Sequence, residues 1–233
     1  VIYRSNHQVR RLELCLQALR IPYRISGGGS FFDKSEVRDA LAYFRLVLNL
    51  ADDMAFLRIV NVPRRQLGAS ALAALTRVAA TSESALLPTV HEHHAEALGN
   101  AYPRFVRFKA QIQEARDGLR RDPPAAVLRG LLEAVDYEGY LRSQEKEDRS
   151  RAAARWQSIE LLLSAIDRRT GDGDAPEDVL RSLMLDDGND AEPSDSEVQL
   201  LTLHAAKGLE FPHVWLMGME EGLLPHRNSL EES

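Results

Sequence analysis

The chain has 233 residues, of which 44% are hydrophobic and 27% are charged, and its formal net charge is −6. This composition excludes a largely disordered chain, and no apolar run approaches the roughly 20 residues that cross a bilayer, so we expect one or two globular domains in the cytoplasm. The acidic balance also excludes a protein that holds nucleic acid through bulk positive charge, so any such contact must be local.

The first 25 residues predict a strand, a helix and a second strand, which together form a piece of a parallel α/β sheet. Residues 1–4 are strand-like, and residues 23–25 form a short apolar run after a proline. Between them, leucines recur at helical spacing at Leu12, Leu16 and Leu19. Cys15 lies in this helix and is the single cysteine of the chain, so a disulfide framework is excluded and we expect a buried, unreactive thiol.

The middle of the chain predicts an inserted helical domain. Gly27, Gly28 and Gly29 interrupt the strand pattern and are conformationally free enough to form a hinge. From residue 35 to about residue 185 nearly every periodic segment is helical, and residues 186–197, DDGNDAEPSDSE, predict an acidic linker. We therefore assign residues 1–32 and 195–233 to one α/β domain and residues 33–194 to an all-α domain inserted into it.

After the linker, the pattern predicts a strand, a polar turn and another strand. Residues 198–203 are β-type, residues 204–208 predict a turn or short helix, and residues 214–217 predict a second buried strand. In an open α/β sheet, ligands bind beyond the carboxyl ends of the strands, where the polar residues of TLHAAKGLEFP, residues 202–212, would lie. The chain contains no GxxxxGK[ST] segment and therefore no phosphate loop of its own.

The segment TLHAAKGLEFP closely resembles motif V of superfamily 1 DNA helicases of the Rep/UvrD/PcrA type. The resemblance implies that Thr202 and His204 contact the backbone of single-stranded DNA and that Glu210 reaches ATP near its ribose. It also implies that Lys207 and Gly208 belong to the coupling between the two sites. The alternative is that these polar groups only cap a helix and satisfy buried backbone groups.

The opening segment YRSNHQVR, residues 3–10, resembles the segment YRxNxQSR of the same family, with Val9 in place of the usual serine. Arg4 and Asn6 occupy positions at which the family contacts single-stranded DNA. A guanidinium suits phosphate, and an amide can bond a base edge or a sugar. Taken without motif V, the segment would predict only a strand end and a helix cap.

A third segment, from the glycine run to PRRQLGAS, resembles the entry into the 2B domain of these helicases. Residues 63–72 predict a helix-hairpin-helix turn, in which Gly68 permits a tight approach and Ser70, with free amides at the next helix start, binds a duplex phosphate. Arg64 and Arg65 would add positive charge. Family members often have glycine where this chain has Gln66, so we expect a less regular hairpin; the alternative is an ordinary αα-corner.

The resemblance covers the whole chain and implies a partial RecA-like domain, 2A, interrupted by a regulatory, duplex-contacting domain 2B. We interpret the chain as an internal piece of a longer ATP-dependent 3′–5′ DNA helicase of replication or repair, with replication or repair proteins as possible partners. ATP and Mg²⁺ are the implied cofactors, but the groups that bind the metal are missing, so we expect this piece alone to be inactive. The alternatives are a nonenzymatic DNA-binding or partner-docking module and the helicase half of a recombination nuclease.

Overall fold

The computed structural model describes residues 1–4, 6–19, 21–26, 30–145, 148–184 and 197–220. The predicted glycine hinge at Gly27–Gly29, nearly all of the predicted acidic linker and the side chain of Asn6 lie outside the described residues. The chain divides into two compact units, which we call the sheet unit, Val1–Lys34 with Ser182–Ser233, and the helical unit, Ser35–Arg181. An α/β part and a helical part are thus both present, as the sequence predicted.

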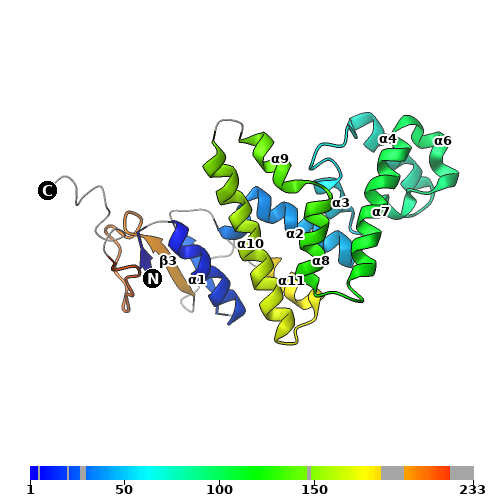
Figure 1. Cartoon of the computed structure of the whole chain (residues 1–233). Coiled ribbons are helices and arrows are strands. Elements are labelled where there is room, and N and C mark those ends of the chain that lie inside the picture. Colours follow the sequence, from blue (N-terminus) through cyan, green and yellow to red (C-terminus); the bar gives the residue numbers. More distant parts are fainter. Residues whose placement is uncertain (5, 20, 27–29, 146–147, 185–196, 221–233) are drawn as a thin grey trace. The chain divides into compact units, whose positions relative to one another are not determined.

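Three parallel strands form the sheet of the sheet unit. They are β1, Ile2–Tyr3, β2, Tyr23–Ser26, and β3, Val198–Thr202, in the order β1-β3-β2. The C-terminal strand therefore lies between two N-terminal strands, with Tyr3 opposite Thr202 and Ser26 opposite Leu201 (Figure 1). Parallel strands need a crossover connection, and α1, Asn6–Ala18, provides it between β1 and β2, which lie on the two sides of β3.

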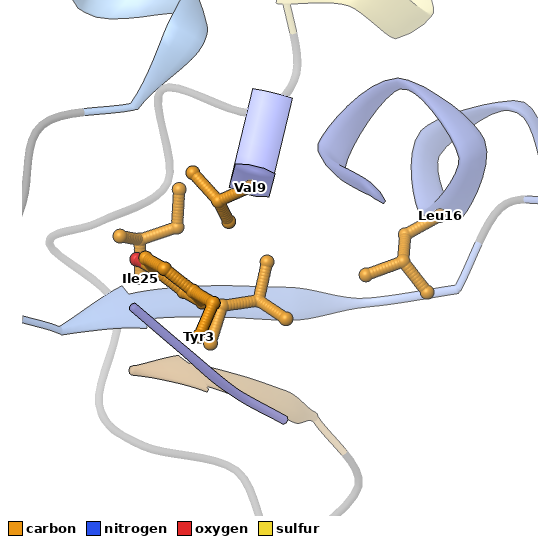
Figure 2. Close-up of a cluster of buried hydrophobic side chains, with 5 residues drawn as sticks. Tyr3, Val9, Leu16 and Ile25 are labelled. Atoms are coloured by element: carbon orange, nitrogen blue, oxygen red, sulfur yellow. The ribbon is translucent and has the colours of Figure 1, made fainter. Parts of the chain in front are cut away.

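Helix α1 covers the sheet with an apolar face. Val9 and Leu16 lie seven residues apart, which is two helical turns, so both side chains point toward the strands. There they pack with Tyr3, Ile25 and Leu200 in the core of the sheet unit (Figure 2). This core makes the sheet unit a compact support for the loops at the strand ends.

The structure contradicts the prediction of a buried thiol, because Cys15 is exposed. Position 15 directly precedes Leu16, and a single step along a helix turns a side chain by about 100° away from its neighbour. The prediction rested on the apolar neighbours of Cys15 in LELCLQAL and did not take this change of direction into account. Leu19 is likewise 68% exposed, so the buried face of α1 does not extend through its last turn.

A polar group, Glu13, is fully buried on the same helix. Its carboxylate accepts hydrogen bonds from the Ser30 hydroxyl at 2.9 Å and from the Phe31 amide at 3.1 Å. Ser30 in turn caps the short 3-10 helix η1, Phe31–Asp33. Glu13 therefore fixes the segment that follows β2, and a buried carboxylate with several donors is the arrangement that offsets its desolvation.

The strand predicted at residues 214–217 forms only an isolated bridge to Ile2. The Ile2 amide donates to the Trp215 carbonyl, and the Met217 amide donates to the Ile2 carbonyl. Its side chains are exposed rather than buried, with Val214 at 55% and Trp215 at 64%. The segment pairs with the edge of the sheet at one residue of β1, and the described residues place no layer over its side chains, so the prediction of a second buried strand is wrong here.

Helices make up the helical unit. They are α2 Ser35–Leu48, α3 Asp53–Ile59, α4 Ala69–Thr81, α5 Leu86–Thr89, α6 Ala95–Leu98, α7 Tyr102–Gly118, α8 Pro124–Ala134, α9 Tyr137–Gln144, α10 Arg149–Gly171 and α11 Pro176–Met184, with 3-10 turns η2 Glu92–His94 and η3 Gly99–Ala101. The division between the two units falls within α11. Over the described ranges, no helix has the length and hydrophobicity needed to cross a membrane.

Helix α2 is the centre of the helical unit and packs against α3, α7, α8 and α10 (Figure 1). It is buried on most of its circumference, as expected of a helix enclosed by others. A buried carboxylate on it is paired: Asp39 accepts from the Tyr137 hydroxyl at 2.7 Å and from Arg58 at 2.8 Å. Next to it, Phe56 of α3 stacks on Phe105 of α7 and meets Phe108 of the same helix edge to face, so aromatic rings fill the core between these helices.

Candidate nucleic-acid interface

The carboxyl ends of β1 and β3 meet at one edge of the sheet. Because Tyr3 lies opposite Thr202 in a parallel pair, the residues that follow, Arg4 and Leu203, leave the sheet at the same level. The Leu203 amide still donates to the Tyr3 carbonyl at 2.9 Å, which holds the two chain segments together beyond the last pair. The structure thus brings together two segments that lie at opposite ends of the chain, around Tyr3 and Thr202, and that the sequence analysis predicted to share a DNA site.

A tight turn follows β3 at residues 203–208. Thr202 begins it: the Thr202 hydroxyl accepts from the Ala205 amide at 3.2 Å, and the Thr202 carbonyl accepts from the Ala206 amide at 2.9 Å. Gly208 ends it with φ of +82°, a left-handed conformation that favours glycine. The Thr202 hydroxyl therefore caps the turn, as the alternative interpretation held, and its own hydrogen is still available to donate to a ligand.

The turn presents its other polar residues to solvent. His204, Lys207 and Glu210 are all exposed. Arg4 is half-buried, its backbone amide donates to Gln8 Oε1 at 2.9 Å, and no partner for its guanidinium is found among the residues that the structure describes. The sheet edge therefore has a guanidinium, an imidazole and an ammonium group available for an anionic ligand.

Asn6 opens α1 directly beyond this edge. Its backbone position follows Arg4 by two residues, as the prediction required. Its side chain lies outside the described residues, so its predicted contact with DNA stays a prediction.

A second candidate interface is the predicted hairpin between α3 and α4. Arg64, Gln66, Gly68 and Ser70 are exposed in it. Gly68 is the N-cap of α4 and has an extended backbone, φ −71° and ψ 177°, and a Cβ added there would meet no atom within 4 Å. The tight approach predicted for Gly68 is therefore not an approach within this chain.

The start of α4 offers backbone donors. The amides of Ala71 and Leu72 are already directed to the Gly68 carbonyl. The amides of Ala69 and Ser70 have no partner within the described ranges, as is usual at the first turn of a helix. With no acidic residue in that turn, the helix start suits an anion, and the contact of Ser70 with a duplex phosphate stays a prediction.

Arg65 differs from its neighbour because its guanidinium points into the loop. Nη1 donates to the carbonyls of Ile59 at 3.0 Å and Pro63 at 3.1 Å, and Nη2 donates to the Tyr43 hydroxyl at 2.8 Å. The guanidinium also lies 4.7 Å from the centre of the Phe108 ring. Its donors are used inside the helical unit, so Arg65 holds the hairpin in shape and is a poor candidate for the predicted contact with DNA.

Tyr43 supports this arrangement from α2. Its hydroxyl donates to the Val62 carbonyl and accepts from Arg65. Burial raises the pKa of Tyr43 to about 12, so the phenol stays a neutral donor at physiological pH. The hairpin is therefore fixed to the core by an arginine and a tyrosine together.

Gln66, which stands where family members often have glycine, has φ of +57° and so keeps a left-handed backbone that glycine adopts readily. A non-glycine residue in the left-handed region costs about 1–2 kcal/mol, whereas glycine costs little there. After subtraction of the entropy that glycine adds to the unfolded chain, Gln66→Gly is expected to raise the free energy of unfolding by roughly 0.5–1 kcal/mol. Urea denaturation followed by Trp156 fluorescence measures this. Gly68→Ala is the control and is not expected to raise the free energy of unfolding, because Gly68 has an extended backbone and alanine is a poorer N-cap than glycine. A Gln66→Gly variant that is less stable than the wild type contradicts the backbone assignment.

The sequence model of a protein family described as "UvrD-like helicase C-terminal domain" matches residues 1–233, which is the whole chain. The chain belongs to this family. The sheet-edge turn and the helical insertion described above are thus features of a UvrD-like helicase C-terminal domain.

Named relatives of this UvrD-like domain include ATP-dependent DNA helicase Rep of Salmonella typhimurium strain LT2, with 38% identity over 100% of this chain and 36% of the relative. DNA helicase II of Escherichia coli K12 is 36% identical, over 100% of this chain and 33% of its own length. ATP-dependent DNA helicase PcrA of Bacillus subtilis strain 168 is 31% identical, over 100% of this chain and 32% of its own length. This chain therefore spans about a third of the length of these relatives.

Two features of this UvrD-like domain were missed from the sequence. One is the inward orientation of Arg65, which no local pattern distinguishes from Arg64. The other is Arg10 on α1, whose Nε is buried and has no hydrogen-bond partner in the part of the chain that the structure describes. The signal was available: Arg10, Glu13 and Gln17 recur at helical spacing on one side of α1, and such a polar line beside an apolar face indicates groups with defined partners or ligands.

Proposed function

We propose that this chain is part of an ATP-dependent 3′–5′ DNA helicase of the bacterial cytoplasm, in which it couples ATP binding and hydrolysis to movement along single-stranded DNA. In this proposal residues 1–32 and 195–233 belong to the motor domain 2A, and residues 33–194 form the inserted domain 2B. One observation carries the proposal: in a chain that matches the helicase family throughout, Arg4 and the Thr202–Gly208 turn lie at one edge of a parallel sheet.

Single-stranded DNA is the ligand that this edge suits. Arg4 and His204 offer donors for phosphate, and Thr202 retains a hydroxyl hydrogen at the beginning of the turn. Asn6, at the first position of α1, would add an amide for a base or sugar. Contacts of this kind hold the backbone without reading sequence, as a translocating motor requires.

ATP with Mg²⁺ is the proposed energy source of the complete helicase. Glu210 is exposed and can accept hydrogen bonds from ribose hydroxyls, and the buried Nε–H of Arg10 has no acceptor among the described residues, so both residues fit a nucleotide. Bound ATP supplies the phosphoryl transfer that drives the motor, and the Mg²⁺ ligands are proposed to lie outside this chain. Lys207 and Gly208 lie between His204 and Glu210, where a shift of the turn connects the nucleotide to the DNA.

Duplex DNA is the proposed ligand of the hairpin in the helical unit. Arg64 is exposed, and so are Ala69 and Ser70, whose amides have no partner among the described residues and follow Gly68 at the start of α4. These groups suit one backbone phosphate at the start of α4. The 2B part would then regulate unwinding by meeting the duplex ahead of the motor, and replication or repair proteins are its proposed partners.

The test of the single-strand site is Arg4→Ala in the full-length protein. Loss of one phosphate contact with a single strand is expected to flatten the plot of log affinity against log salt by about 0.7, and to weaken binding roughly fivefold to tenfold at 50 mM salt. His204→Ala is expected to have a smaller effect, since a guanidinium always carries full charge. Filter binding of an unstructured oligonucleotide at several salt concentrations measures both.

Arg11→Ala is the matched control for Arg4→Ala. Arg11 is exposed on α1 and loses the same charge on substitution, but no strand end adjoins it. Its line is expected to stay within error of the wild type. If Arg4→Ala and Arg11→Ala give the same line, Arg4 does not contact the DNA backbone.

A further inference from the structure

A hollow of about 410 Å³ lies beside the hairpin in the helical unit. It lies between the loop at residues 63–66, helix α7 and the end of α8. We call it the arginine hollow, because its lining includes Arg64, Arg65, Arg104 and Arg107. Its volume is in the range of sites that hold a ligand group rather than a single water molecule.

Positive charge is not compensated in this hollow. Four arginines and one acid, Asp136, line it, which leaves a local charge of about +3 in a chain whose total is −6. None of the four arginines forms a salt bridge with a residue of the described ranges. Asp136 is the N-cap of α9, and its carboxylate accepts from the Gly139 amide at 3.2 Å.

The arginines differ in how much of their hydrogen-bonding capacity is used. Arg65 is committed to the loop, and Arg104 donates to the Asn100 carbonyl at 3.1 Å and only distantly to Gln66 Oε1, at 3.5 Å. Arg64 and Arg107 are exposed and have no partner in the described part of the chain. Two free guanidinium groups from different elements therefore converge on one hollow, with a third that can turn toward a ligand.

The chemistry of the lining favours a phosphate of a nucleic-acid backbone. A guanidinium binds phosphate through two parallel hydrogen bonds, and Gln66 adds an amide donor, whereas the Gln111 amide donates to the Ala134 carbonyl at 3.2 Å. The aromatic residue of the lining, Phe108, is fully buried beneath Arg65, so it offers no face on which a base can stack and no anchor for a peptide side chain. Arg64 belongs both to the hollow and to the hairpin, so a backbone at the start of α4 can continue into the hollow.

We propose that the arginine hollow is a second phosphate site for duplex DNA, in which Arg107 and Arg104 hold a backbone phosphate next to the one at the start of α4. This proposal rests on the proposed function, because it assumes that the hairpin meets a duplex. It adds α7 to the proposed interface with duplex DNA. Asp136, the acid of the lining, would repel the phosphate and so limit the affinity for the duplex.

The test compares a 3′-tailed duplex with the tail alone as ligands of the full-length protein without nucleotide. The double variant R104Q/R107Q is expected to flatten the salt dependence for the tailed duplex by about one to two units and to weaken binding at 50 mM salt by about tenfold or more. Binding of the single-stranded tail is expected to be unchanged. Arg116→Gln is the control, since Arg116 is exposed on the same helix but does not line the hollow.

Asp136→Asn provides a test of opposite sign. Asparagine also caps helices and tolerates the left-handed backbone that Asp136 adopts, φ +54°, so the substitution removes charge with little change of shape. It is expected to strengthen binding of the tailed duplex severalfold at low salt.

Unchanged binding of the tailed duplex by R104Q/R107Q overturns the proposal, even if the wild-type protein unwinds DNA. It is also overturned if the double variant weakens binding of the single-stranded tail as much as binding of the duplex. Loss of polyglutamate binding alone would likewise overturn it and would indicate an acidic protein partner. Failure of the wild-type protein to bind either DNA would instead remove the proposed function itself.

Discussion

Replacing Arg65 by alanine is expected to lower the free energy of unfolding of the helical unit by about 3 kcal/mol. The substitution removes donors to the carbonyls of Ile59 and Pro63 and to the Tyr43 hydroxyl, and it removes the contact with the Phe108 ring. Hydrogen bonds from a charged donor contribute about 1.5–3 kcal/mol, and the acceptors left behind are partly buried. Arg65→Lys is expected to recover little of the loss, because an ammonium cannot span acceptors that lie around a planar fork.

Arg64→Ala is the control, since it removes the same charge from the adjacent residue. Arg64 is exposed and forms no hydrogen bond or ion pair within the described residues, so its replacement is expected to change stability by less than about 0.5 kcal/mol. The two variants are expected to differ in the opposite way in binding of a tailed duplex. At a temperature where both are folded, Arg64→Ala is expected to weaken binding more than Arg65→Ala. Urea denaturation followed by Trp156 fluorescence, in a Trp215→Phe background, reports the stability. Equal stability of the two variants would contradict the inward orientation of Arg65.

Local patterns predicted most of the regular structure. Helical spacing of leucines predicted α1, and β-type runs predicted strands near residues 2, 23 and 198, each within a residue or two of the observed bounds. The helical character of residues 35–184 was also predicted and is confirmed. These elements follow from periodicity because each has one face against a core, which imposes the spacing of apolar residues.

The order of the strands and the burial of some side chains depend on long-range packing and could not be predicted from local patterns. The insertion of β3 between β1 and β2 depends on pairing across nearly 200 residues, and only the resemblance to helicases suggested that residues 3–10 and 202–212 share a site. Cys15 and residues 214–217 were predicted to be buried because their neighbours are apolar. Cys15 is exposed because it lies one helical step from the buried Leu16, and residues 214–217 have exposed side chains because they lie at the edge of the sheet.

The site was predictable in position rather than in detail. Exposed His204, Lys207 and Glu210 lie at the strand end, where the pattern placed them. No sequence pattern distinguishes a guanidinium that holds its own loop from one that is exposed to a ligand, because Arg64 and Arg65 are identical in type and adjacent. That distinction depends on Tyr43 and Phe108, which come from α2 and α7.

The central claim, that this chain belongs to a DNA motor, is tested most directly by strand separation with the full-length protein. With ATP and Mg²⁺ it is expected to separate a duplex with a 3′ single-stranded tail and to leave one with a 5′ tail intact, because the motor would move 3′ to 5′. The 233-residue chain alone is expected to hydrolyse ATP no faster than buffer in the presence of DNA, since it has no phosphate loop. Strand separation that requires ATP and the 3′ tail is the predicted result. A full-length protein that binds the same DNA but neither hydrolyses ATP nor separates the strands would contradict the claim and would establish a nonenzymatic DNA-binding module instead.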